Sequence, residues 1–309
     1  MIVDLLYVLA GLVLLVLGGD LLVKGSVNLS LRLGVAPLVV GLTVVAFGTS
    51  APEMIVSVSA ALKGASAIAM GNVVGSNIAN VLLILGAAAL VSGIPTHEHD
   101  LRESWGMMIA ASVLLIGMAF TGVIGRVEGL VLLIALGLVL WRQLSTARAD
   151  KDGADLEGAA LGARWRQISI WLAGGLIGLP IGANLLVSGA SDIALAFGIS
   201  EAVIGLTLVA VGTSLPELAA SVASAMRGRA DMALGNVVGS NIFNILSILG
   251  VTALVQPLPV PAEILRLDLW VMLASALLLG PFLFRGLYIG RVAGGAFFAA
   301  YGVYLWVLL

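Results

Sequence analysis

The chain has 309 residues, of which 61% are hydrophobic and 10% are charged, with a formal net charge of -2 and no cysteine. A water-soluble fold of this length cannot cover so much apolar surface, so the composition predicts a bilayer protein. The near-neutral charge argues against nucleic-acid binding, and the absence of cysteine excludes disulfides and thiol chemistry.

Ten apolar runs of about 20 residues follow one another along the chain, each long enough to cross the hydrocarbon core of a bilayer. The first run carries Asp4 where a signal peptide would carry Lys or Arg, so we interpret it as a membrane helix. We therefore predict an all-α polytopic membrane protein with ten transmembrane helices. They cover residues 3–30, 37–62, 68–92, 103–121, 124–144, 166–195, 202–226, 232–255, 266–284 and 287–308.

A polar connection at residues 145–164 divides the chain into a first half, 1–144, and a second half, 165–309. Each half contains five predicted helices, and because five is odd, the second half must enter the membrane from the opposite side. We therefore predict two inverted five-helix repeats, an organisation that secondary transporters use.

The distribution of Lys and Arg predicts the orientation of the chain. With the N-terminus outside, all but three of the 15 Lys and Arg residues lie in cytoplasmic loops or at cytoplasmic helix ends, and the three are Lys63, Arg126 and Arg266. This positive-inside bias predicts that both termini are extracytoplasmic and that residues 145–164 are a cytoplasmic linker in a protein of the cytoplasmic membrane.

Two loops contain residues that could bind a stray metal ion. Residues 149–158 read ADKDGADLEG, similar to a calcium-binding loop, but Ala154 occupies the third ligand position. His97 and His99 stand two residues apart in a predicted turn with nothing to orient them. We expect both loops to be solvated connections.

Two motifs occur twice, each time at an offset of 164 residues. Residues 41–53 read GLTVVAFGTSAPE and residues 205–217 read GLTLVAVGTSLPE, identical at ten of thirteen positions. Residues 71–80 read GNVVGSNIAN and residues 235–244 read GNVVGSNIFN, identical at nine of ten. The repeat predicts one site built from two copies.

The first motif places a carboxylate near the middle of predicted helices 2 and 7, as Glu53 and Glu217. A carboxylate there costs about 2.5 to 3.5 kcal/mol on insertion scales, and no Lys or Arg nearby could pair with it, so we favour a functional role. Pro52 and Pro216 each remove a backbone donor and should break helices 2 and 7 at the midplane. Broken helices are tolerated in lipid only where the freed carbonyls are buried in protein or line a polar cavity.

Further oxygen ligands accompany the two carboxylates. The same turns contain the hydroxyls of Thr49, Ser50, Thr213 and Ser214. In the second motif, pairs four residues apart share one helix face, namely Ser76 with Asn80 and Ser240 with Asn244. Four more amides could belong to the site or only join helices by hydrogen bonds: Asn72, Asn77, Asn236 and Asn241.

The predicted site offers oxygen ligands without imidazole or thiolate, which suits Ca2+ and Na+ and does not suit Zn2+ or Cu2+. Two negative charges balance one Ca2+ or a pair of Na+ ions. Because the same carboxylates must serve both cations, binding of one should exclude the other, which is the condition for exchange. We expect Ca2+ and Na+ to be transported substrates, with no cofactor and no obligatory protein partner.

The paired motifs GxxxxAxGTSxPE and GNxxGSNxxN resemble the alpha repeats of the cation/Ca2+ exchanger superfamily, and most closely its prokaryotic Na+/Ca2+ exchanger branch. The resemblance implies that Glu53 and Glu217 bridge the central cation sites, with the neighbouring hydroxyls as ligands. It also implies carbonyl ligands at Ala46 and Ala210, whereas the proline argument alone frees the carbonyls of Gly48 and Gly212. The remaining ligands that it implies are Thr49, Ser50, Ser76, Asn80, Thr213, Ser214, Ser240 and Asn244. The family's transport model has spans 1 and 6 sliding across the other eight.

The chain departs from some relatives at two places. Asn244 stands where certain Na+/Ca2+ exchangers have Asp and K+-dependent relatives have an acidic residue nearby, so we expect K+ independence. Gly75 and Gly239 occupy the place where the proton-coupled branch typically has an acidic residue. The resemblance therefore favours Na+ coupling over H+/Ca2+ antiport, which is the alternative.

Other functions are less compatible with the sequence. A passive cation channel could use the same ligands, but paired carboxylates should hold a divalent ion too tightly for fast permeation. An intramembrane protease would need a histidine near its serine or an HExxH motif in a span, and the chain has only His97 and His99. Asp20 and Lys24 are four residues apart on the first span, and we expect them to form a local ion pair.

Overall fold

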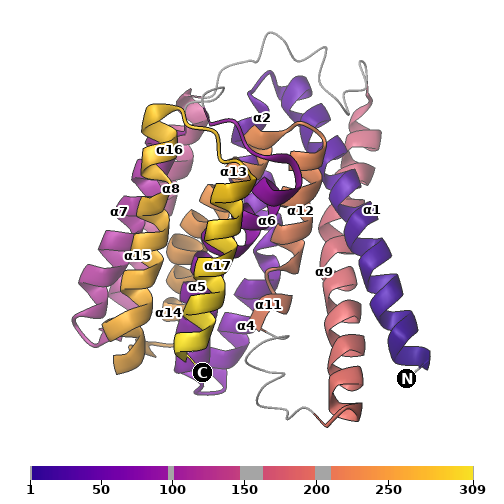
Figure 1. The fold of residues 1–309 in the computed structure, drawn as a ribbon. Helices are drawn as coiled ribbons and strands as arrows, with labels where there is room; N and C mark the ends of the chain where they lie inside the picture. Colours follow the sequence, from indigo (N-terminus) through magenta and orange to yellow (C-terminus); the bar gives the residue numbers. More distant parts are fainter. Residues whose placement is uncertain (1, 97–100, 147–162, 199–209, 309) are drawn as a thin grey trace.

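The computed structural model describes residues 2–96, 101–146, 163–198 and 210–308. Helices make up nearly all of this part of the chain and run alongside one another in one bundle (Figure 1). The predicted all-α class is therefore confirmed, with two strands of two residues each as a small addition within the described residues.

The first half is a series of helices, and two of its helical runs, Pro37–Thr49 and Ser66–Ser92, each contain a wider helical turn. In two places a π-helical turn, labelled η, continues an α-helix. The elements are α1 (Ile2–Leu33), α2 (Pro37–Val40), η1 (Gly41–Val45), α3 (Ala46–Thr49), α4 (Ala51–Leu62), α5 (Ser66–Ala79), η2 (Asn80–Ile84), α6 (Leu85–Ser92), α7 (Arg102–Ala119), β1 (Val123–Ile124) and α8 (Arg126–Thr146).

The second half repeats this series as far as it is described. Its π-helical turn η5 begins at Asn244, the counterpart of Asn80 at the start of η2. The elements are α9 (Trp165–Ala196), α11 (Ala210–Gly212), α12 (Leu215–Met226), α13 (Ala230–Phe243), η5 (Asn244–Ile248), α14 (Leu249–Val255), β2 (Leu258–Pro259), η6 (Ile264–Asp268), α15 (Leu269–Leu278), α16 (Gly280–Arg285) and α17 (Arg291–Leu308).

Seven described helical segments are long and apolar enough to cross a membrane, and a bent pair in the first half makes an eighth if it counts as one span. Of the other two predicted spans, 103–121 corresponds to α7, which begins with Arg102 and Glu103. For the span at 202–226, residues 202–209 lie outside the described residues. The loops at 97–100 and 149–158 also lie outside them.

The bent pair lies where the sequence predicts a helix break. The segments Pro37–Thr49 and Ala51–Leu62 meet at an angle of 42°. Ser50 joins them with φ of -82° and ψ of 3°, outside the helical range, and Pro52 stands in the first turn of α4, where a backbone N–H is not needed. In the second half, α11 ends at Gly212 and α12 starts at Leu215, so the chain leaves helical geometry at the same place in the motif.

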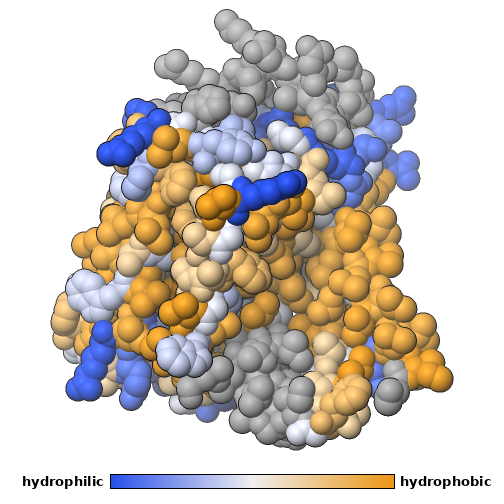
Figure 2. Space-filling model, viewed as in Figure 1, coloured by the Kyte–Doolittle hydropathy of each residue, from blue (hydrophilic) through white to orange (hydrophobic). Residues whose placement is uncertain are grey.

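The bundle is apolar outside and polar at its centre. Orange apolar side chains form a wide band over the middle of the surface, with blue polar residues towards the two ends (Figure 2). Large apolar residues are exposed on this band, among them Val16 and Trp306. The most buried spans are α5 to α6 and α13 to α14, whose apolar stretches are 78% and 89% buried, against 22% in α1 and α9. A lipid-facing surface with an internal polar site is the arrangement expected in a bilayer.

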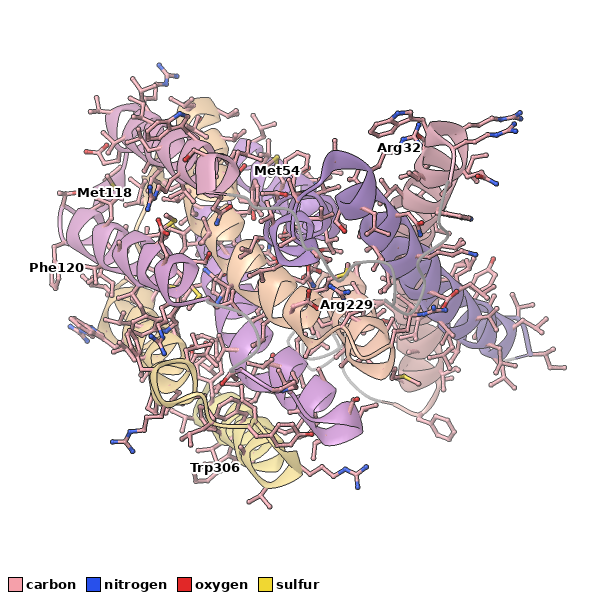
Figure 3. All side chains as sticks on the ribbon, turned by 90° about the horizontal axis from the view of Figure 1, so that it is seen from above. Arg32, Met54, Met118, Phe120, Arg229 and Trp306 are labelled. Atoms are coloured by element: carbon pink, nitrogen blue, oxygen red, sulfur yellow. The ribbon has the colours of Figure 1, made fainter. Side chains whose placement is uncertain are left out.

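Helices α1 and α9 pack against each other along their length, on one side of the molecule (Figure 3). Glycines repeat every seven residues on both, and the offset of 164 relates the two sets. At Gly11 a Cβ atom would lie 2.6 Å from the backbone nitrogen of Leu186, and at Gly182 it would lie 3.0 Å from the carbonyl of Gly11. Glycine therefore allows the two backbones to approach closely. The glycines are Gly11, Gly18, Gly25, Gly175, Gly182 and Gly189.

The ion pair predicted within α1 is wrong. Asp20 pairs with Arg227, just after the end of α12, instead of with Lys24. The Lys24 ammonium lies 4.5 Å from the ring centre of Trp171 on α9. A spacing of four along the sequence allowed the local pair, but neighbouring helices offer both groups other partners.

Short strand pairings close the loops at the two opposite ends of the bundle. Ile94 forms an antiparallel bridge with Ile289 at one end, and Ile124 of β1 pairs with Leu258 of β2 at the other. The offset of 164 relates Ile94 to Leu258, so each half contributes a corresponding residue to one of the two pairings. The start of α1 and the end of α17 lie at one end of the bundle (Figure 1).

Candidate functional site

The two repeated glutamates lie inside the bundle, each in the first turn of a helix and directly after that turn's proline. Glu53 is the third residue of α4 and Glu217 is the third residue of α12, and both are only 1% exposed. Two ionised carboxylates buried without a neighbouring cation in the described residues are expensive, so the pair favours neutralisation by a bound cation or by a proton.

The hydroxyls of each first motif contact the opposite half of the protein. Ser50 donates a hydrogen bond to Glu217 Oε1 at 3.0 Å. Thr49 contacts Asn236 Oδ1 at 3.3 Å, and Thr213 contacts Asn72 Oδ1 at 3.5 Å. The two copies therefore interlock around one centre.

Asn72 and Asn236 hold the helices that carry the glutamates. The amide nitrogen of Asn72 donates to the carbonyl of Glu53 at 3.2 Å and to the Ser57 hydroxyl at 2.9 Å. Asn236 makes the equivalent contacts, to the Glu217 carbonyl at 3.4 Å and to Ser221 at 2.9 Å. The amides thus join helices and also border the site, the two roles that the sequence could not separate.

Asn80 and Asn244 stand at the starts of the π-helical turns η2 and η5. Their amide nitrogens donate to the opposite half: Asn80 to Asn241 Oδ1 at 2.9 Å, and Asn244 to Asn77 Oδ1 at 3.3 Å. Ser76 receives a hydrogen bond from Ser214 at 3.4 Å. These contacts bring the second motif of each half to the same centre as the first motif.

Several buried oxygens at this centre have no hydrogen-bond partner among the described residues. A buried polar atom without a partner is uncommon and calls for an explanation. Five of the atoms in question belong to residues of the predicted site, and each is a hard oxygen donor of the kind that binds Ca2+ or Na+. The atoms are Glu53 Oε2, Glu217 Oε2, Asn80 Oδ1, Asn244 Oδ1 and Ser240 Oγ.

The two alanines differ in their backbone contacts. The Ala46 carbonyl accepts from the Ser50 amide at 3.1 Å and from the Thr49 hydroxyl at 3.3 Å. In the second copy, the Ser214 amide instead donates to Val211 at 3.0 Å, so it does not occupy the carbonyl of Ala210. The Ser50 amide and the Ser214 amide therefore bind at different places in the two copies of the motif.

Sequence reasoning missed two pairs of residues around the site. Ser57 and Ser221 bind the amides that hold the glutamate helices, and both are fully buried. Met108 and Met272 contact Asn241 and Asn77. The offset of 164 relates the members of each pair, so the repeat, extended beyond the two motifs, would have identified them.

The family model of the sodium/calcium exchanger proteins matches residues 3–145 and 168–309. The chain belongs to this family. Members of this family are ion exchangers and not enzymes. The apolar helices of this chain make it a multi-pass membrane protein. The resemblance expected from the two repeated motifs is confirmed.

Relatives match this exchanger over most of its length. A putative antiporter, CaxA, of Alkalimonas amylolytica is 39% identical over 287 residues, covering 90% of this chain and 89% of the relative. The sodium/calcium exchanger MaX1 of Methanosarcina acetivorans is 36% identical over 344 residues, covering 99% of this chain and 98% of the relative.

Solved structures with the same fold include those of the sodium-calcium exchanger NCX_Mj. One, soaked with zero Na+ and Ca2+, has a TM-score of 0.86 and 36% identity and covers 100% of this chain and 99% of that chain. Another, soaked with 2.5 mM Na+ and 0.1 mM Ca2+, has a TM-score of 0.85 and covers 98% and 97%. The overall arrangement of the exchanger is therefore that of NCX_Mj.

Proposed function

We propose that the protein is a secondary active antiporter that exchanges Na+ for Ca2+ across the cytoplasmic membrane by alternating access. One observation carries the proposal: two buried carboxylates, one from each repeat, converge with buried oxygens that have no partner among the described residues. The twelve proposed cation ligands are Ala46, Thr49, Ser50, Glu53, Ser76, Asn80, Ala210, Thr213, Ser214, Glu217, Ser240 and Asn244.

The proposed architecture has ten transmembrane helices in two inverted five-helix repeats, 1–144 and 165–309, joined by a cytoplasmic linker at 145–164. Helices 2 and 7 are broken at the midplane. The 42° bend at Ser50 and the interruption between α11 and α12 support the breaks. The twofold pattern of hydrogen bonds around Asn72 and Asn236 supports the repeat.

Both chain ends are placed on the extracytoplasmic side. The support is the concentration of Lys and Arg at the other end of the helices, and the positions of α1 and α17, which begin and end at one end of the bundle (Figure 1). Ca2+, Na+ and the lipid bilayer are then the only partners that the function requires.

Alternating access needs an element that can move past the ligands. The helices α1 and α9 are suited to this, because they pack on each other through glycines and contain none of the proposed ligands. We assign the sliding movement to this pair and the stationary site to the other helices.

Na+ coupling is favoured over H+ coupling by the packing at Gly239. A Cβ atom there would lie 2.6 Å from the Leu42 carbonyl and 2.8 Å from the Ala46 Cβ. An acidic side chain, the feature of the proton-coupled branch at this place, does not fit the packing at Gly239, whereas a Cβ at Gly75 meets nothing within 4 Å.

The test is Ca2+ uptake by purified protein in proteoliposomes. Uptake should require an opposing Na+ gradient, saturate with Ca2+ and show counterflow. Uptake that ignores Na+ and follows a pH gradient would establish H+/Ca2+ antiport instead, and uptake without saturation or counterflow would establish a channel.

A further inference from the structure

The amides of Asn80 and Asn244 can point towards a cation with either their oxygen or their nitrogen, and only the oxygen can bind it. Both nitrogens donate across the interface between the halves, at 2.9 Å to Asn241 Oδ1 and at 3.3 Å to Asn77 Oδ1. The oxygens of Asn80 and Asn244 are left buried and without a partner among the described residues. The contacts that set the orientation of the Asn77 and Asn241 amides therefore also set the orientation of the Asn244 and Asn80 oxygens.

Two series of hydrogen bonds run from the ligand amides, one from Asn80 through Asn241 and one from Asn244 through Asn77, and each ends on groups that only accept hydrogen bonds. Asn241 Nδ2 donates to the sulfur of Met108 at 3.5 Å and to the backbone carbonyl of Asn77 at 3.3 Å. Asn77 Nδ2 donates to the sulfur of Met272 at 3.5 Å. A thioether sulfur and a carbonyl have no proton to give, so each chain has one direction.

Reversing either ligand amide would disturb every hydrogen bond between that amide and the methionine at the other end of its series. If Asn80 turned its nitrogen towards the cation, its oxygen would face the oxygen of Asn241. Turning Asn241 as well would place that oxygen against the Met108 sulfur and the Asn77 carbonyl, two further acceptors. Both reversals leave acceptors facing acceptors in a buried region, which is costly.

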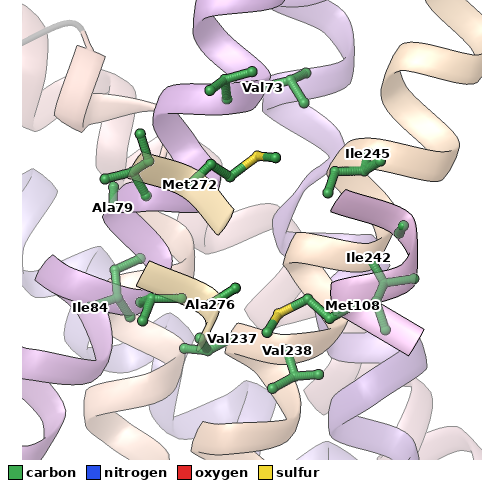
Figure 4. Close-up of a cluster of buried hydrophobic side chains, with 14 of the residues drawn as sticks. Val73, Ala79, Ile84, Met108, Val237, Val238, Ile242, Ile245, Met272 and Ala276 are labelled. Atoms are coloured by element: carbon green, nitrogen blue, oxygen red, sulfur yellow. The ribbon is translucent and has the colours of Figure 1, made fainter. Parts of the chain in front are cut away.

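The surroundings strengthen this effect. Met108, Met272 and Asn77 are at most 1% exposed, and both methionines belong to the buried apolar cluster drawn in Figure 4. Water is therefore excluded from the methionine sulfurs and the Asn77 carbonyl that accept these hydrogen bonds, and a hydrogen bond in such a region is stronger than one at the surface.

From this geometry we infer that Asn77 and Asn241 are positioning residues. Each is held by a methionine and turns the side-chain oxygen of a ligand amide in the opposite repeat towards the transported cation: Asn241 acts on Asn80, and Asn77 acts on Asn244. This inference rests on the proposed function, since it concerns the orientation of proposed ligands. It predicts that Asn80 is held more firmly than Asn244, because Asn241 has two acceptor anchors and the shorter bond to its ligand amide.

The decisive experiment measures equilibrium binding of radiolabelled Ca2+ to purified variants. Asn241→Leu should weaken Ca2+ affinity about tenfold and Asn77→Leu should weaken it less, since removal of an outer-shell partner typically costs 10- to 100-fold in metal affinity. Met108→Leu keeps the apolar volume, removes only the acceptor, and should weaken affinity about threefold, so it provides the test if Asn241→Leu does not fold.

A double-mutant cycle separates positioning from a general structural role. In an Asn80→Ala background, where there is no amide left to orient, Asn241→Leu should cause no further loss of Ca2+ affinity. An equal loss in both backgrounds, or full affinity in Asn241→Leu and Met108→Leu, would overturn the inference while leaving the antiporter proposal in place. Failure of the unchanged protein to bind Ca2+ would remove both.

Discussion

The centre of the molecule and the α1/α9 pair are built in opposite ways. At the centre, α5 and α13 are almost fully buried, and polar contacts connect each half to the other. The α1/α9 pair is largely exposed, and its two helices pack on each other with glycines of one against leucines of the other. Its described ion pair to the remainder of the bundle is formed by Asp20 and Arg227. A dense hydrogen-bond network holds a fixed geometry, whereas a helix pair with few described polar links to the other helices has little to break on sliding past them. The difference indicates a rigid site beside a movable element.

The largest effect is expected from removing one of the two carboxylates at the centre. Glu53→Gln and Glu217→Gln should each lower Na+-dependent Ca2+ uptake at least about 100-fold, because loss of one partner of a buried charged contact costs about 3 kcal/mol or more. The measurement is uptake in proteoliposomes by protein that elutes as a folded species. Near-normal uptake by either variant would refute the site.

A change in the α1/α9 pair should affect movement and leave binding intact. In Gly11→Ala the new Cβ meets the Leu186 nitrogen and the Gly182 carbonyl, and overpacking of this kind costs about 1 to 3 kcal/mol. Uptake should fall about tenfold while equilibrium Ca2+ affinity stays within about twofold.

Gly137→Ala in α8 is the matched control for this variant, since a Cβ there meets nothing within 4 Å. It should leave uptake unchanged and protein stability equal or slightly higher, because alanine is the better helix former by about 1 kcal/mol. Weakened Ca2+ affinity in Gly11→Ala would show that the pair and the site are not separate.

The ion pair between Asp20 and Arg227 is expected to matter less. Its side chains are 44% and 26% exposed, so it contributes about 1 kcal/mol or less to the stability of the conformation described here. Asp20→Asn should lower the melting temperature in detergent by about 2 °C, and Arg227→Gln should do the same. The double variant should lose no more than either single one, and an additive loss would mean that each group has a separate role.

The smallest effect is expected at the surface. Glu103 pairs with Arg142 at 2.5 Å, but the two side chains are 48% and 52% exposed. Glu103→Gln should therefore change stability by less than about 1 kcal/mol and leave Ca2+ uptake at the level of the unchanged protein. Loss of uptake would show that charge removal alone, wherever it occurs, accounts for the result at Glu53.

The sequence predicts what is local or repeated. Helix positions, the interruption before Glu53 and the convergence of the two motifs all follow from apolar length, proline chemistry and an offset of 164 residues. The partner of Asp20 could not be predicted, because Arg227 is 207 residues away and nothing in the local pattern favours it over Lys24. The methionine contacts of Asn77 and Asn241 were likewise hidden, since a methionine in a helix normally indicates an apolar core.

The cross-repeat contacts of Asn80 and Asn244 were beyond prediction, because their acceptors Asn241 and Asn77 are 161 and 167 residues away along the chain. The π-helical turns that begin at Asn80 and Asn244 were also not predicted, since no residue type announces such a turn in advance. Regular helical spacing correctly placed Ser76 and Asn80 on one face, but it could not identify the cross-repeat acceptors of the amides.

The hydrogen bonds that cross between the halves have a consequence for each half taken by itself. Ser50 reaches Glu217, Asn80 reaches Asn241, and Asn244 reaches Asn77, so each half depends on the other to complete its own network. Under the proposed inverted-repeat architecture, a single half could complete this network only by pairing with a second copy inserted in the opposite orientation. Outside the shared motifs the two halves differ, and Asp20 in the first half corresponds to Asn184 in the second.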